Sequence, residues 1–459
     1  MPGIPRQHYY VNRIITGHLF EDGEDLTFDR CSIAFDQLPT WVHRSGVQVS
    51  LQTQTPDISA SPDKITIEFT PLQDEIAQIG DEILRLSSTW TLGGNNITQT
   101  YLNQGTYLEL KYPAAQPLDT ILDDVKHFQD LLTLATAAPT VPEEITLWRE
   151  DIVRELPSGE QRPQAMDYYA GQLAERVRLD APQSSGKVLF QFNDIGGLPT
   201  VAQWVKVARE YRTVLGSLLS IRYAAGLYVE NRFNNVISAA ESLHRLRFPN
   251  EVMPDEKFQQ IISEILSDVR KSRQRWLKYK LKYTNEPRLW DRLDGLVQYA
   301  GAAFAILYDD LKSWITVVTE SRNRLTHHDK ERAIDFQSGD LYFLTESVFV
   351  LVMLCMFREC GVGDDVLNSV QPLKSACLGG SWPSGTISSL VVSPMNETRH
   401  SRRTAQWWCS IAGPWPSSTR RPRRAHCPAG RAEPGNAVTA AAAVLSLLPV
   451  LRARRKAVQ

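Results

Sequence analysis

Cysteine is scarce in this chain of 459 residues, with six in all, and no two of them form a C-x-x-C pair. Neither a zinc site nor a disulfide framework is therefore indicated. The amino terminus lacks a charged-then-apolar leader, and we expect that no apolar run reaches the length needed to span a bilayer. No cluster of carboxylates suggests bound magnesium. These absences predict a protein of the reducing cytoplasm with no membrane partner, no metal and no cofactor.

A large excess of one charge is also lacking, because the net charge is only −2. The balance along the chain is uneven, since residues 371–459 contain 13 Lys/Arg against two Asp/Glu. The preceding 370 residues therefore carry a net charge of about −13. Such an acidic body is not expected to attract nucleic acid in general, so a polyanion would need a local basic surface.

The hydrophobic pattern predicts an α+β multidomain chain. We expect a β-rich domain over residues 1–186 and an all-α helical bundle over residues 187–370. In the first, apolar residues alternate in short runs, a turn separates two of these runs, and one amphipathic helix follows. The expected strands are 46–53, 64–69, 107–112 and, at the junction, 188–192; the turn is 91–98 and the helix 118–134.

From Thr200 to about residue 362 the apolar period becomes helical. The last segment is almost wholly apolar and would be the central, buried helix of the bundle. The expected helices are 204–218, 233–246, 258–269, 287–298, 308–326 and 340–358.

Residues 371–459 lack coherent periodicity and are rich in Arg, Pro, Ser and Ala. One interpretation is a disordered basic tail that binds nucleic acid. The other is a frameshift in the gene, which we favour because tryptophan and cysteine are scattered through an otherwise polar segment. An open second reading frame that continues the bundle would support the frameshift.

The stretch "SRNRLTHHDK" (321–330) is the strongest candidate for a reaction centre. Arg322 and His327 are five residues apart, about 140° around an ideal helix, so they converge only if the helix ends between them. The composition of the following residues is that of a loop. A histidine in a last helical turn can exchange protons near neutral pH, and a guanidinium beside it matches a phosphate. Asn323 would add a neutral donor.

These groups suffice for metal-independent cleavage of RNA. The ribose 2′-hydroxyl already lies next to the phosphorus, so an enzyme need only move protons and stabilise charge. The alternative is that Arg and His are ordinary capping residues at a helix end, and on spacing alone this alternative is the stronger one.

The context of the stretch resembles a known family. "SRNRLTHHD" is similar to the Arg-Asn-x-x-x-His motif of HEPN-domain ribonucleases, and above all to the ApeA-like HEPN group of bacterial anti-phage abortive-infection systems. Upstream segments resemble the same group in the same order, over roughly residues 10–362. They include "NVISAAESLHRL" (235–246), "NEPRLWDRLDGLV" (285–297) and "VLFQFNDIGGLPTVAQWVKVAREY" (188–211).

The resemblance implies an active site made of Arg322, Asn323 and His327. His328 and Glu241 would be supporting residues, with Glu241 orienting Arg322 or His327 from a facing helix; an ordinary solvated acid is an equal alternative. The family also implies pairing of two bundles in a homodimer, with RNA, and tRNA in particular, as the partner. A phage-derived trigger is implied as well.

A basic segment, "RKSRQRWLKYKLKY" (270–283), would supply the local basic surface as the tail of the third expected helix. Cations and rings on one helix can pair with phosphates and stack on unpaired bases. We assign RNA binding to some of the cations and expect Trp276 and Tyr283 to pack inward. The candidate RNA-binding residues are Arg270, Lys271, Arg273, Arg275 and Lys278.

The leading hypothesis is thus a cytoplasmic endoribonuclease that acts as the toxic effector of phage defence. Its β-rich domain would sense infection or restrain the bundle. A second hypothesis is a non-catalytic RNA- or protein-binding module whose histidines are structural. A third is a damaged copy that has lost its natural C-terminus and its activity.

Overall fold

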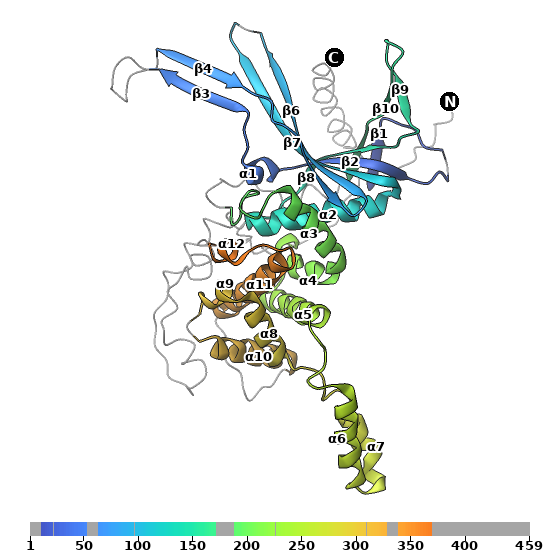
Figure 1. The fold of residues 1–459 in the computed structure, drawn as a ribbon, viewed down its shortest axis with the longest axis vertical. Helices are drawn as coiled ribbons and strands as arrows, with labels where there is room; N and C mark the ends of the chain where they lie inside the picture. Colours follow the sequence, from blue (N-terminus) through green and yellow to red (C-terminus); the bar gives the residue numbers. More distant parts are fainter. Residues whose placement is uncertain are drawn as a thin grey trace, which may run out of the picture. The chain divides into compact units, whose positions relative to one another are not determined.

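A computed structural model describes residues 11–21, 23–52, 63–95, 97–170, 188–224, 226–308, 310–327 and 338–369. The tail at 371–459 and His328 lie outside these residues. The described chain falls into two compact units, of which the smaller holds residues 45–72 and 88–105. The larger unit holds the rest, including most of a β-sheet and all of the helices (Figure 1). The expected α+β architecture is confirmed.

In the described residues, seven strands form one sheet in the order β1-β11-β8-β2-β7-β6-β5. The central strand, β2, alternates buried residues with partly exposed ones, so one face of the sheet builds a core from Phe28, Cys31, Ile33 and Phe35. The strands are β1 (Arg13–Thr16), β2 (Thr27–Phe35), β5 (Glu75–Ile79), β6 (Glu82–Gly94), β7 (Thr100–Pro117), β8 (Pro142–Trp148) and β11 (Met166–Ala170). A separate small hairpin consists of β9 (Val153–Glu155) and β10 (Gln161–Pro163).

Two helices lie close to this sheet. α1 (Leu38–Val42) is one short turn, and α2 (Leu118–Thr136) packs on β2 with its apolar stripe, which includes Ile121, Phe128 and Leu131. The predicted helix at 118–134 is confirmed. α2 also buries the carboxylate of Asp124, which accepts hydrogen bonds from Tyr112 and Arg209.

The smaller unit contains a hairpin of β3 (Val47–Gln52) and β4 (Lys64–Phe69), where alternation had predicted two strands. Val49 pairs with Ile67 and Leu51 with Ile65, so these four side chains share one face. They are 58–64% exposed. In the same unit β6 ends at Gly94 and β7 starts at Thr100, which confirms a turn within 91–98.

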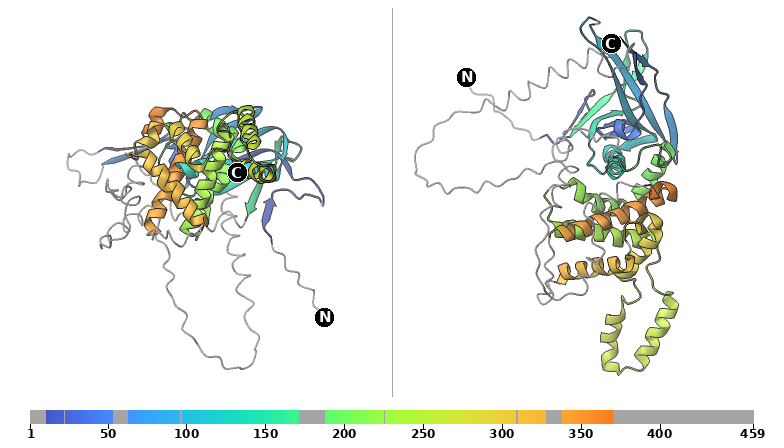
Figure 2. Two further views of the ribbon diagram at one scale, coloured as in Figure 1. Left: turned by 90° about the horizontal axis from the view of Figure 1, so that it is seen from below. Right: turned by 90° about the vertical axis from the view of Figure 1, so that its left-hand side faces the viewer.

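The bundle contains more helices than the periodicity predicts. They are α3 (Leu198–Glu210), α4 (Arg212–Tyr223), α5 (Val229–Arg247), α6 (Asp255–Ser267), α7 (Lys271–Leu281), α8 (Leu289–Ala300), α9 (Ala302–Ala305), α10 (Leu311–His327), α11 (Ser338–Glu359) and α12 (Asp364–Asn368). The single helix expected at 204–218 is wrong, because the chain leaves the helical conformation at Tyr211 between α3 and α4. Figure 2 shows α5, α8, α10 and α11 layered together.

The segment at 188–192 is not a strand. Its apolar side chains are nevertheless buried, and its backbone N–H groups bond to single carbonyls of other segments rather than to a partner strand. Leu189 donates to Ala135 at 2.8 Å, and Phe192 donates to Trp41 at 3.1 Å. The β-like pattern therefore reflects burial in a loop.

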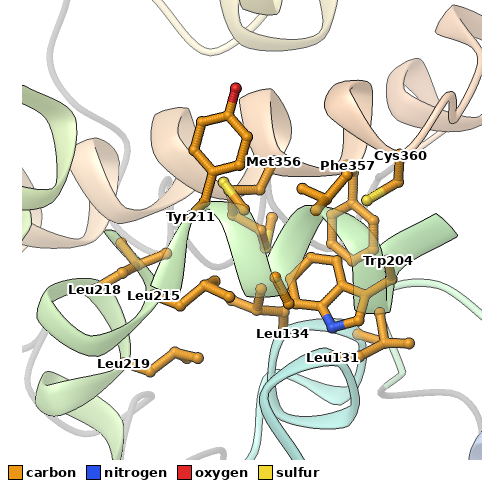
Figure 3. Packing of buried hydrophobic residues seen from close by; sticks show 14 of the residues in the cluster. Leu131, Leu134, Trp204, Tyr211, Leu215, Leu218, Leu219, Met356, Phe357 and Cys360 are labelled. Carbon is orange, nitrogen blue, oxygen red and sulfur yellow. The ribbon is translucent and has the colours of Figure 1, made fainter. Parts of the chain in front are cut away.

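The core of the bundle forms around α11. Within the described residues, this helix is long and apolar enough to cross a membrane, with a mean hydropathy of 1.8 over Asp340–Glu359, so the expectation that no run reaches that length is wrong. The window is 83% buried inside the protein, and α11 therefore serves as the central helix, as predicted. Figure 3 shows Phe357 of α11 against Trp204 of α3, with ring centroids 5.9 Å apart.

Candidate active site

α10 carries the "SRNRLTH" stretch and is fixed in the bundle by its apolar face. Trp314, Ile315 and Val318 are fully buried, and the indole Nε1 of Trp314 donates to Ser347 of α11 at 3.0 Å. Ser321 is buried on the same face, with its hydroxyl donating to the carbonyl of Val317. The helix therefore has one fixed rotation about its axis, which decides where the polar residues of its last turns lie.

Arg322 and Asn323 come together at the surface of α10. Arg322 stands at the edge of the buried face and is half-buried, whereas Asn323 is exposed. The guanidinium Nη1 of Arg322 donates to the amide oxygen of Asn323 at 3.3 Å. A fork of N–H donors, which is suited to binding a phosphate, and an amide thus share one patch of surface.

The backbone of α10 stays helical through His327. The expected helix end between Arg322 and His327 is therefore wrong, and the two positions remain about 140° apart around the axis. Position 327 instead follows Asn323 by four residues, so Asn323 and His327 start from the same face of the helix. Thr326 closes the last turn by donating to the carbonyl of Arg322 at 2.8 Å.

Of the two supporting residues, Glu241 does not join this patch, and His328 lies outside the described residues. Glu241 is half-buried on α5 and makes no hydrogen bond or ion pair there with Arg322 or Asn323. Its charge acts on Arg292 of α8 instead, where it opposes the lowering of the guanidinium pKa by burial. Arg324, the other cation of the stretch, pairs with Glu320 at 3.4 Å.

Sequence reasoning missed a buried polar network between α5 and α8. Arg292 is 2% exposed and His244 6% exposed, and Nη1 of Arg292 lies 3.2 Å from Nδ1 of His244. Because a guanidinium only donates, His244 must accept with Nδ1 and carry its proton on Nε2. Burial, reinforced by the charge of Arg292, lowers the pKa of His244 to about 4. The available signal was a histidine within the apolar stripe of 233–246.

The same network fixes the chain that leaves α5. Arg292 Nη2 donates to Asn250 at 2.6 Å, and Glu286 lies 3.5 Å from Arg245 and 3.8 Å from Arg292. These contacts hold the segments that enter and leave the hairpin of α6 and α7.

The basic residues expected to bind RNA lie on that hairpin, and their helix differs from the prediction. The basic segment is not the tail of the third expected helix, because α6 ends at Ser267 and α7 starts at Lys271. The inward packing expected of Trp276 and Tyr283 is wrong as well, since each is 62% exposed. Arg270 directly precedes α7, and Lys271, Arg273, Arg275 and Lys278 lie along it.

No group of three or more His, Cys, Asp or Glu is arranged to hold a metal ion among the residues that the structure describes. A pocket of about 780 Å³ lies in the β-sheet region, lined in part by Arg30, Trp148 and Arg149. Its two arginines have local partners, because Arg149 bonds to Glu24 and Asp151 and Arg30 stacks on Trp148.

Two family models match the chain. ApeA N-terminal domain 1 matches residues 1–202, and Apea-like HEPN matches residues 234–366, a segment that starts within α5, ends within α12 and contains the whole of α10. The chain belongs to the ApeA-like HEPN proteins. Comparison with curated proteins and with solved structures found no match.

The family match bears on how the Arg322–Asn323 contact on α10 is interpreted. The HEPN match places the Arg-Asn pair of residues 322–323 within a domain type found in ribonucleases and anti-phage effectors. The N-terminal match covers the β-sheet, α1 and α2, so the β-rich region is a family domain in its own right.

Proposed function

We propose that this protein is a metal-independent endoribonuclease that acts as a toxic effector of anti-phage defence in the cytoplasm. The observation that carries the proposal is the contact of Arg322 with Asn323 on the exposed surface of α10, one turn before His327, in an Apea-like HEPN domain. The substrate would be RNA in single-stranded or loop regions, with tRNA as the family's suggestion.

In the proposed reaction the 2′-oxygen of a ribose attacks the adjacent phosphorus and the bond to the 5′-oxygen of the next nucleotide breaks. The products are a 2′,3′-cyclic phosphate and a free 5′-hydroxyl. His327 exchanges the proton of an attacking or leaving oxygen, and Arg322 stabilises the charge that builds on the phosphorane. Asn323 holds the guanidinium and the phosphate in place.

A second copy of the chain completes the proposed site. Because Arg322 and His327 diverge around α10, one protomer presents them on different flanks. A homodimer through the bundle, as the family implies, would bring Arg322 of one protomer close to position 327 of its partner. The N-terminal domain would respond to a phage-derived trigger or restrain the bundle.

The decisive test compares the wild-type protein with His327→Ala during phage challenge and on purified RNA. We expect the variant to lose RNA cleavage and growth arrest while its circular dichroism is unchanged. Wild-type cleavage should persist in EDTA and leave 2′,3′-cyclic phosphate ends. His18→Ala is the matched control: this exposed histidine lies in the bend that follows β1, and the variant should cleave normally. Full cleavage by His327→Ala would refute the assignment.

The divergence of Arg322 and His327 on a continuous helix also supports a second candidate, a non-catalytic RNA- or protein-binding module. In that case neither Arg322→Ala nor His327→Ala changes any RNA product. Arg322→Lys separates the two candidates further, because it keeps the charge but loses the planar fork. The nuclease would be impaired by it, whereas a module that needs only a positive surface would not.

A further inference from the structure

The hairpin of α6 and α7, here called the arm (residues 255–283), is built from residues that are almost all accessible. Ile262 is the one buried residue of α6, and α7 has none. The two helices pack mainly against each other, as Figures 1 and 2 show. Gln274 of α7 fixes their turn by donating to the carbonyls of Leu266 and Val269. The apolar side chains of the arm therefore have no bundle core to enter.

The base of the arm is held more firmly than its tip. Asn285 accepts from the backbone N–H groups of Val252 and Met253 at 2.7 and 3.0 Å, and its side-chain amide donates back to Met253 at 2.9 Å. Asn285 itself is 8% exposed. The arm thus has a defined attachment to α5 and α8 despite its accessible surface.

Three aromatic rings line one side of α7. Trp276 and Tyr279 are three residues apart, and Tyr283 follows in the turn after the helix, so the three start within about 60° of one another. They are 62%, 72% and 62% exposed. Leu277 and Leu281 point to a different side and are half-buried. Apolar burial against α6 therefore uses the leucines and leaves the rings to the solvent.

Cations flank the rings on both sides. Lys280 and Arg273 start on one flank of the ring face, and Arg275 and Lys282 on the other. Between residues 270 and 283 there are seven Lys/Arg and no Asp or Glu. In the described chain none of these cations forms an ion pair, and the ammonium of Lys282 lies 4.9 Å from the ring of Tyr283. Among the described residues, these cations therefore have no acidic partner.

We propose that the ring face of α7 binds single-stranded RNA, with bases stacked on Trp276, Tyr279 and Tyr283 and phosphates on the flanking cations. This inference rests on the proposed function, because the arm would gather the substrate that α10 cleaves. The strip of positive charge is narrow, because the neighbouring helix is acidic. α6 contains Asp255, Glu256 and Glu264, and Asp268 lies in the turn that follows it. One strand fits such a strip, whereas a broad anionic lipid surface would also meet these acids.

Binding is tested on the full-length chain carrying His327→Ala, so that the RNA remains intact. The probe is a fluorescein-labelled 15-nucleotide oligouridine, with a duplex RNA of equal length for comparison. Loss of one stacking ring weakens single-strand binding by roughly 5- to 150-fold. We expect Trp276→Ala with Tyr279→Ala and Tyr283→Ala to weaken oligouridine binding more than tenfold and duplex binding much less. Replacing the same three residues by Phe should restore binding.

The contribution of the cations is measured separately, through the salt dependence of RNA binding. Removing Arg273, Arg275 and Lys282 together should reduce the slope of log K against log salt by about 2, because each phosphate contact on a single strand contributes about 0.7. The matched control replaces Tyr228, which is 78% exposed, and Lys206, which is exposed on α3, by Ala. Those substitutions should leave affinity and salt slope unchanged.

Oligouridine affinity that survives the triple ring-to-Ala variant would overturn the proposal. So would equal losses for single-stranded and duplex RNA, or tight binding to vesicles of phosphatidylglycerol with none to oligouridine. In the His327 wild-type background, the ring variant should raise KM for RNA and leave kcat unchanged. Absence of cleavage with intact oligouridine binding would refute the nuclease and keep the arm as an RNA-binding element.

Discussion

The buried His244–Arg292 pair predicts that acid weakens the bundle. The folded protein holds the pKa of His244 at about 4, against 6.5 for an ordinary histidine, mainly because burial disfavours the charged ring. Between pH 6.5 and pH 4, His244 is therefore protonated in the unfolded chain but stays neutral in the folded chain. Stability is full above this pH and is lost as the pH falls towards 4, by about 3 kcal/mol in all and about 2 kcal/mol at pH 5.

His244→Asn isolates this effect. The Asn oxygen takes the place of Nδ1 and still accepts from Arg292, but it does not titrate. At pH 7.5 the variant should be less stable by about 1 kcal/mol, because it loses the ring contact with Phe248. At pH 5 the wild-type advantage should vanish or reverse, since only the wild type bears the cost of about 2 kcal/mol.

The assay is urea unfolding of the full chain, followed by tryptophan fluorescence at pH 7.5, 6 and 5. His127 adds to the acid sensitivity of both proteins, because burial lowers its pKa to about 4 as well. Its contribution is the same in wild type and His244→Asn, so it cancels in their difference. A difference in unfolding free energy that does not vary between pH 7.5 and 5 would refute the reasoning.

Three further predictions concern packing and backbone. Arg222 donates to both carboxylate oxygens of Glu346, at 2.8 and 2.5 Å, and Glu346 is 5% exposed. Arg222→Ala leaves this carboxylate buried without its partner and should lower the free energy of unfolding in urea by about 3–5 kcal/mol. Adding Glu346→Leu should recover much of the lost stability. Phe357→Ala, at the buried contact with α3, should cost about 3–5 kcal/mol in the same measurement, and a cost below 1 kcal/mol would contradict the packing. Gly94 has φ of +122°, and a Cβ there would lie 2.1 Å from the carbonyl oxygen of Gln99. Gly94→Ala should therefore speed hydrogen exchange over residues 88–105 without changing exchange in α11; unchanged exchange in that turn would argue against the strain.

Hydrophobic periodicity correctly predicted those helices and strands whose apolar pattern follows from residues close together in the sequence. The strands at 46–53 and 64–69 and the helix at 118–134 follow from alternation and from a regular apolar stripe. The segment at 188–192 has the same alternation, but no strand lies beside it, so burial alone produced the pattern. Pattern shows which residues avoid water and does not show what they pair with.

The errors at the candidate site have a related cause. Trp276 and Tyr283 were expected to pack inward because large rings usually do, but burial needs a partner surface and the arm offers only α6. The helix end near His327 is a boundary, which sequence locates only to within a few residues. The His244–Arg292 pair joins residues 48 positions apart, a separation at which no local pattern reports contact.

The attachment of the arm has a consequence for how such proteins diversify. The chain departs at Val252–Met253 and returns at Asn285, where mutual hydrogen bonds tie positions 32 residues apart. A chain segment whose two ends lie next to each other can be shortened, replaced or transplanted without disturbing the flanking helices, here α5 and α8. The arm is thus a segment that recombination could exchange while the sequence of α10 stays the same.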